Sequence, residues 1–122
     1  MTFLPALSMH GQAITRSQDY LRDVISLSEV LGKAHAVRIV CNGRNDQHWR
    51  AYMMRLLELE APYQGGLRRS MVDGFNAGFA TGEAMHQACD AATKAAEKDY
   101  AAQGQALTLT LTAENIPDAT GR

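Results

Sequence analysis

The stretch from Val37 to Pro62, VRIVCNGRNDQHWRAYMMRLLELEAP, decides how this chain folds. Asn42 and Gly43 both tolerate a positive φ, so they predict the end of a preceding helix. Asn45 or Asp46 can cap a second, shorter helix, which ends at 61–62 because the residue before a proline avoids helical geometry. The apolar face of this second helix consists of Trp49, Met53, Leu56 and Leu57. The stretch therefore predicts two helices joined by a tight turn.

Residues 17–41, which precede the turn, predict a long first helix. Ser17 is placed to accept a hydrogen bond at the helix start, and Asp19 adds a negative charge to the first turn. Apolar side chains recur three and four residues apart, as they do on one face of a helix. These side chains are Tyr20, Val24, Leu27, Val30, Leu31, Ala34 and Val37.

Residues 67–87 predict a third helix, with apolar positions at Leu67, Met71, Phe75, Phe79 and Met85. Gly74, Gly78 and Gly82 stand four apart on one stripe of this helix. Each glycine inside a helix costs about 1 kcal/mol relative to alanine. Three glycines in register therefore indicate close packing against another helix, with an interface or a ligand groove as the alternative.

A fourth helix is predicted from Asp90, a residue that can cap its start. This helix is thin because it is rich in alanine, and we expect it to pack on the glycine stripe. The alanines are Ala92, Ala95, Ala96, Ala102 and Ala106. Leu107 to Thr112 alternates as a strand does, but no partner strand is predicted, so we interpret it as a continuation of the helix.

Together these elements predict an all-α domain, a small bundle of about four helices. We expect it to cover residues 17–114, with a flexible tail or signal remnant at 1–16 and a disordered tail at 115–122. A chain of 122 residues is long enough for one domain with its own core. The net charge of -1 argues against attraction of the whole chain to nucleic acid, and no apolar run approaches the roughly 20 residues that span a bilayer.

Charge is distributed unevenly along the chain. Six arginines accompany three acids between Arg38 and Arg69, whereas seven acids accompany three basic residues from Asp73 to Arg122. Such runs are usually solvated helix faces, but complementary halves also suit a contact within the fold or between copies. The candidate partner-binding residues are Arg38, Arg44, Trp49, Arg50 and Arg55, although a single Trp on an apolar face is also typical of a core.

The two cysteines, Cys41 and Cys89, follow helices one and three, whose ends can lie together in an antiparallel bundle. Their spacing leaves open a disulfide in an oxidising compartment and two buried thiols in a cytosolic core. A zinc site with His48 and His86 is a weaker alternative, because C-x6-H … H-x2-C matches no established pattern. We find no phosphate loop and no catalytic constellation, so we expect neither an enzyme nor a cofactor.

Three segments, LSEVLGKAHAVRIVC, HWRAYMMRLLELEAP and MVDGFNAGFATGEAMHQAC, resemble a family of small uncharacterised alphaproteobacterial proteins, a domain-of-unknown-function family. The matching positions are Leu27, Leu31, Cys41, Trp49, Arg50, Leu56, Leu57, Glu60, Ala61, Pro62, Phe75, Asn76, Gly78 and Cys89. The resemblance implies that Cys41 and Cys89 form a disulfide that staples the bundle. It also implies a periplasmic protein, although residues 1–16 do not form a complete secretion signal.

We therefore expect a non-catalytic periplasmic accessory protein that binds another envelope protein or a second copy of itself. The alternative is a helical module that binds a small ligand, or a metal through His48 and His86. A cytoplasmic location is the alternative to the periplasm.

Overall fold

The structure is a computed structural model that describes residues 17–115. It contains α2 (Gln18–Asn42), α3 (His48–Glu60), α4 (Gly66–Met85) and α5 (Ala91–Asn115), with no strand in this range. The prediction of an all-α bundle of about four helices is confirmed. Leu107 to Thr112 is helical, and α5 continues to Asn115, one residue into the predicted tail. The predicted tail at 1–16 and the rest of the tail after 115 lie outside the described residues.

The helix boundaries follow from local hydrogen bonds that the sequence predicts. Ser17 Oγ accepts from the backbone N–H of Tyr20 at 2.9 Å and so caps α2. At the other end of α2, Gly43 has a φ of 95° and donates its N–H to Ile39. Asp90 Oδ1 accepts from the N–H of Thr93 at 2.9 Å at the start of α5. These contacts satisfy backbone groups that a helix end leaves without partners.

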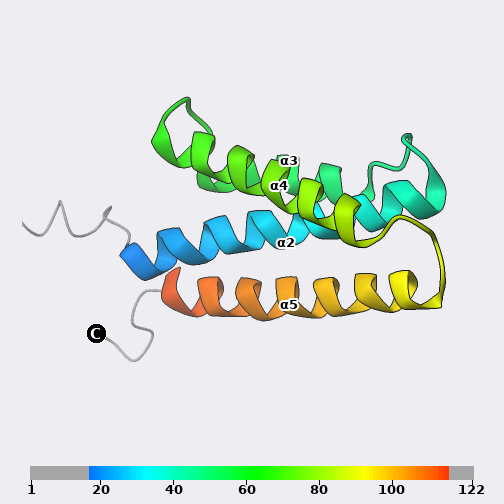
Figure 1. Cartoon of the computed structure of the whole chain (residues 1–122). Coiled ribbons are helices and arrows are strands. Elements are labelled where there is room, and N and C mark those ends of the chain that lie inside the picture. Colours follow the sequence, from blue (N-terminus) through cyan, green and yellow to red (C-terminus); the bar gives the residue numbers. More distant parts are fainter. Residues whose placement is uncertain (1–16, 116–122) are drawn as a thin grey trace, which may run out of the picture.

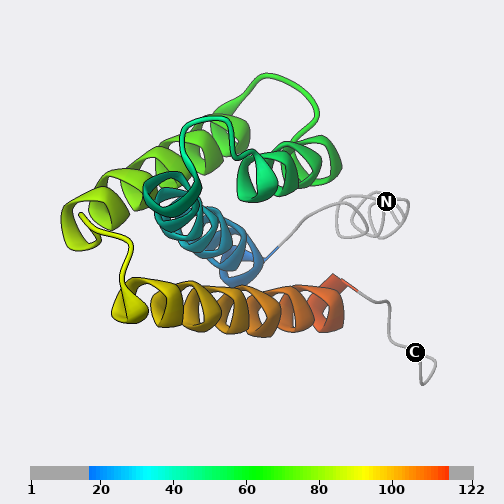
Figure 2. The ribbon, with the colours of Figure 1, turned by 90° about the vertical axis from the view of Figure 1, so that its right-hand side faces the viewer.

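Helix α2 lies at the centre of the molecule. Figure 1 shows the four helices running alternately in opposite directions, with α3 and α4 on one side of α2 and α5 on the other. Figure 2 shows the same layers along α2. Among the described helices, the backbone of α5 approaches α2 alone, whereas α3 and α4 also touch each other. Helix α2 therefore supplies more of the core than any other described helix.

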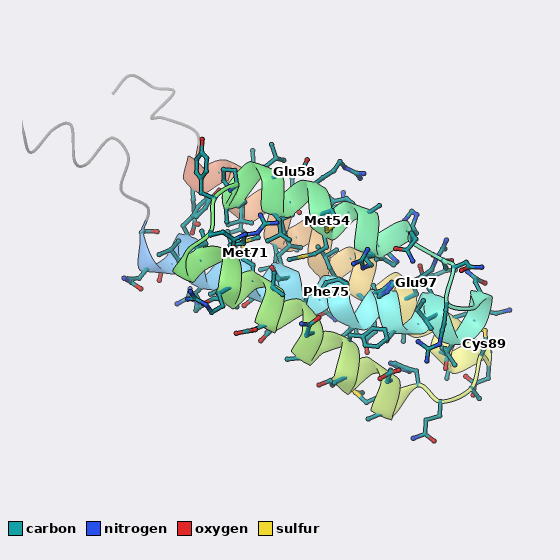
Figure 3. All side chains as sticks on the ribbon, turned by 90° about the horizontal axis from the view of Figure 1, so that it is seen from above. Met54, Glu58, Met71, Phe75, Cys89 and Glu97 are labelled. Atoms are coloured by element: carbon teal, nitrogen blue, oxygen red, sulfur yellow. A yellow bond between two sulfur atoms is a disulfide. The ribbon has the colours of Figure 1, made fainter. Side chains whose placement is uncertain are left out.

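The core is built from the apolar faces that the sequence predicts for α2 and α3. On α2 the face is buried, and Val24 and Val37 have no exposed surface. The buried residues of α3 are Met53, Leu56 and Leu57. They pack in the same core cluster as two residues of α4, Met71 and Phe75 (Figure 3).

The prediction that Met85 belongs to the apolar face of α4 is wrong, because Met85 is 64% exposed. The face of α4 that meets α2 runs through Gly74, Gly78 and Gly82, which stand four residues apart. Residues four apart lie on the same side of a helix, so Met85 falls beside this face.

The glycine stripe of α4 packs closely, but its partner is α2 and not the alanine-rich helix, so that prediction is wrong. A Cβ atom at Gly78 would overlap the backbone carbonyl of Glu29, and one at Gly82 would lie 2.7 Å from the Cβ of Ala36. Gly32 is the counterpart on α2, because a Cβ there would overlap the carbonyl oxygen of Phe75. The backbones of α2 and α4 therefore approach too closely to admit a side chain at these positions.

The alanines of α5 mark its exposed side, which explains why the stripe does not meet them. Ala92, Ala95, Ala102 and Ala106 are exposed, and Ala96 is half-buried. The side of α5 that faces α2 carries instead the buried Tyr100, Gly104 and Leu111. Burying a tyrosine or leucine removes more apolar surface from water than burying an alanine does, so the larger side chains determine which face turns inward.

Cys41 and Cys89 form a disulfide with an S–S distance of 2.04 Å, as the family resemblance implies. Cys41 lies in the last turn of α2, and Cys89 lies in the exposed link between α4 and α5. The bond therefore ties the end of the central helix to the start of α5. Within residues 17–115, no helix combines the length and the apolar character that crossing a membrane requires.

Candidate functional site

An apolar groove runs between α3 and α5, above the buried face of α2. It consists of two adjoining cavities of about 400 Å³ and about 230 Å³. Leu27, Tyr52 and Thr108 line both cavities, so the two lie side by side. The larger cavity lies toward Tyr20 and Leu111, and the smaller one toward Trp49 and Tyr100. We call this the α3–α5 groove.

The groove exists because neither neighbouring helix fills the space above α2. Helix α3 buries Met53, Leu56 and Leu57 in the core. Tyr52 lies on the side of this short helix that faces α5, where it lines the groove. Helix α5 contributes the small residues Ala101 and Gly104 at the same level. Among the described residues, the backbones of α3 and α5 make no direct contact. The side chains of the two helices therefore form the sides of an open cleft.

Charged side chains lie in the larger cavity of the groove. The guanidinium carbon of Arg55 lies 5.4 Å from the centroid of the Tyr52 ring, a cation–π distance. Glu60 accepts hydrogen bonds from the hydroxyl of Tyr20, at 3.0 Å to each carboxylate oxygen. The described residues that line the smaller cavity carry no formal charge. The groove therefore has a charged end and an uncharged end.

The end of the bundle near the disulfide is held by a polar network that joins three helices. Trp49 Nε1 of α3 donates to Glu97 Oε2 of α5 at 2.9 Å, and Arg38 of α2 lies 3.5 Å from the same oxygen. The Nε atom of Arg38 also lies 3.0 Å from Asp46 Oδ2. Figure 3 shows Glu97 and Cys89 toward the same end of the molecule. Two predicted partner-binding residues, Arg38 and Trp49, thus use their polar groups within the fold.

The charge of Asp46 is stabilised by this network. Burial acts to raise its pKa, but hydrogen bonds from the Asn42 side chain, the His48 N–H and Arg38 outweigh that effect and lower the pKa to about 2. The side chain of Asp46 is only 9% exposed. The prediction that Asn45 or Asp46 is the N-cap of α3 is wrong, because Gln47 is the N-cap; Asp46, one residue earlier, accepts a hydrogen bond from the N–H of His48.

We expect Asp46→Asn to lower the free energy of unfolding at neutral pH by about 1–2 kcal/mol, because it removes a charged partner of Arg38. The pKa of Asp46 is lowered in the folded state, so its contribution is present above about pH 4 and is lost as the pH falls toward 2. Urea unfolding of both proteins between pH 7 and 2 measures this. A stability difference that does not shrink over the acidic range would contradict it.

The three histidines of the described region lie in different surroundings. His48 is exposed and lies edge-on to the Trp49 ring, with centroids 4.6 Å apart. His86 Nε2 is 2.8 Å from the hydroxyl of Tyr100. His35 is buried beside Phe75 and Phe79, and its Nδ1 has no hydrogen-bond partner in the structure. Burial lowers the pKa of His35, the positive charge of Arg50 lowers it further, and Asp46 acts in the opposite direction.

The metal alternative requires ligands that the described residues do not bring together. His48 and His86 are engaged with aromatic side chains on different elements, and both cysteine sulfurs are in the disulfide. Within residues 17–115 no group of three or more His, Cys, Asp or Glu side chains is arranged to hold a metal ion.

Arg44, Arg50 and Arg55 are exposed, unlike Arg38. Arg50 lies beside a small cavity of about 120 Å³ between α3 and α4, whereas Arg55 lines the α3–α5 groove. Their role in binding a partner stays a prediction.

Sequence reasoning missed two features of this arrangement. Gly32 could have been found, because Ser28, Gly32 and Ala36 form a stripe of small residues four apart, like that of α4. The role of Glu97 could not have been found, because nothing near it in the sequence indicates that it joins Arg38 to Trp49.

One family of proteins matches this chain. It is described as "Protein of unknown function (DUF2385)", and it matches residues 19–114. This range contains all four described helices, apart from the first residue of α2 and the last residue of α5. No curated protein and no solved structure matches the chain. Because the match covers well over half of the 122 residues, the chain belongs to the DUF2385 family.

Proposed function

We propose that this protein is a non-catalytic binding module of the bacterial periplasm that holds an apolar chain in the α3–α5 groove. The observation that carries the proposal is the larger cavity, of about 400 Å³. Pockets for small ligands typically measure roughly 300–1,000 Å³ and are lined by apolar side chains with a few polar groups. The lining of this cavity fits that description, because it combines the apolar Leu27, Leu56 and Leu111 with the charged Arg55 and Glu60.

The shape of the cavity suits a flexible chain. The cavity extends along α2 from Tyr20 to Leu27, about two helical turns. A hydrocarbon chain can follow such an elongated space between the side chains. We therefore prefer the small-ligand alternative to protein binding.

The disulfide supports the proposed compartment. Structural disulfides persist in oxidising environments such as the periplasm and are rare in the cytosol. The side chain of Cys89 is exposed, so a reducing medium would have access to the bond. The non-catalytic role is supported by the same bond, since it occupies both thiols of the chain.

The test uses Trp49, the single tryptophan of the chain, which lines the smaller cavity. Titration of the full chain with dodecan-1-ol is expected to give a saturable change in tryptophan fluorescence. Thr108 lines both cavities, so Thr108→Phe is expected to fill the groove and abolish the change.

Thr110→Phe is the matched control for this test. Thr108 and Thr110 both donate their hydroxyls to the carbonyl four residues earlier, at 2.8 and 3.1 Å, but Thr110 is exposed. The control is expected to bind like the wild type. Equal binding by both variants, or no saturable signal in the wild type, would overturn the proposed function.

A second candidate is contact with another envelope protein or with a second copy of the chain. Leu59 and Tyr63, at the end of α3 and in the loop after it, are 75% and 83% exposed. Light scattering of the purified protein over a range of concentrations tests self-association. A dimer that Thr108→Phe dissociates would assign the groove to a second copy and would contradict ligand binding.

A further inference from the structure

We infer that the ligand of the α3–α5 groove is a single-chain amphiphile with an anionic head group, which binds at Arg55 with its tail directed toward Trp49. This inference rests on the proposed function and adds the charge and the orientation of the ligand.

Formal charge is distributed unevenly along the groove. Of the described residues that line it, the two with a formal charge, Arg55 and Glu60, both lie in the larger cavity. The smaller cavity is lined mainly by apolar groups, among them Val30, Leu31 and Ala34. A ligand with a charged head and an apolar tail would match this asymmetry, with its head in the larger cavity.

The sign of the head group follows from the partners of Arg55 and Glu60. Arg55 makes no ion pair with any described residue, whereas the carboxylate of Glu60 accepts hydrogen bonds from Tyr20. The ring of Tyr52 lies beneath the guanidinium of Arg55 and limits its positions. A guanidinium presents paired N–H donors that fit a carboxylate or phosphate, and such charge-assisted bonds are stronger than neutral ones.

A tail that leaves Arg55 would meet apolar side chains on its way into the smaller cavity. Tyr52, three residues before Arg55 on α3, lines both cavities, as does Leu27 of α2. From Leu27 to Ala34 the smaller cavity extends along α2 for about 10 Å. Trp49 lines its side, so the tail of a bound ligand would lie where tryptophan fluorescence detects it.

The experiment compares three probes with the same chain, all below their micelle-forming concentrations: dodecanoate, dodecan-1-ol and dodecylammonium. Binding to the full chain is measured by the fluorescence of Trp49. Dodecanoate is expected to bind about tenfold more tightly than dodecan-1-ol, because its carboxylate adds one charge-assisted contact. Dodecylammonium is expected to bind more weakly than either of the other two probes. Arg55→Gln is expected to remove the tenfold advantage of dodecanoate and leave the affinity for dodecan-1-ol unchanged.

Arg50→Gln is the matched control, because Arg50 lies on the same helix but faces the cavity between α3 and α4. It is expected to keep the preference for dodecanoate. If the three probes bind equally, or if Arg55→Gln changes nothing, the inference fails while the proposed function stands. If dodecylammonium binds most tightly, the head group is cationic and Glu60 is its partner, which also overturns the inference. If no probe binds, the proposed function itself fails.

Discussion

Replacing Cys41 and Cys89 together with alanine is expected to lower the free energy of unfolding by about 4 kcal/mol. The disulfide joins residues 48 apart in the sequence, and a cross-link over a loop of this length restricts the unfolded chain by about that amount in the chain-entropy model. A typical domain is stable by only 5–15 kcal/mol, so the variant would lose a large fraction of its stability. Urea unfolding of the wild type and the double variant measures the difference.

The reduced wild type is the control for the double variant. Both lack the cross-link, so their urea midpoints are expected to agree within experimental error, and both are expected to lie well below that of the oxidised protein. Two free thiols in the unfolded, unreduced wild type would show that the bond does not form. In that case the stability of the bundle would have to come from non-covalent packing and hydrogen bonds.

Gly78→Ala is expected to lower the free energy of unfolding by about 3 kcal/mol, near the upper end of overpacking effects. The added Cβ would overlap the backbone of Glu29, and a backbone atom cannot move aside as a flexible side chain can. Helices α2 and α4 would have to separate along the seam where Gly32 and Gly82 also pack. Thermal or urea unfolding of the variant measures the loss, and circular dichroism checks that the helices remain.

Gly104→Ala is the matched control, since Gly104 also lies inside a helix and faces α2. A Cβ there would meet the nearest atom, Leu27 Cδ1, at 3.6 Å, an ordinary van der Waals contact. Because alanine favours helix over glycine, this variant is expected to be more stable than the wild type by up to about 1 kcal/mol. If Gly78→Ala also stabilises the protein, the close approach of α2 and α4 is not present in solution.

The helices could be predicted from the sequence because their signals are local. Ser17 and Asp90 cap helices whose starts depend on bonds to residues three positions away. The inward face of α2 could be predicted for the same reason, since its spacing is a property of one helix. Even Leu107 to Thr112 could be assigned, because a strand without a partner leaves its backbone groups unpaired.

The pairing of helices could not be predicted, because it depends on which surfaces match across long stretches of sequence. Gly78 indicated a close neighbour but not its identity, and the small residues of α2 around Gly32 fit it better than the alanines of α5. The α3–α5 groove could not be predicted for a related reason. It is a space left between two helices that each pack on α2, and no sequence pattern records the distance between them.

The way in which α5 is attached has a consequence for local unfolding, because α2 is the one described helix that its backbone approaches. The first turns of α5 are held by the disulfide at Cys89 and by the hydrogen bonds of Glu97 and Tyr100, whereas its last turns depend on Leu111 and the packing around it. Regions with fewer buried contacts open with a smaller free energy than the whole domain. We therefore expect the amide protons of α5 to exchange with solvent at unequal rates, fastest beyond the buried Leu111, so that the end of the helix beside the larger cavity separates first.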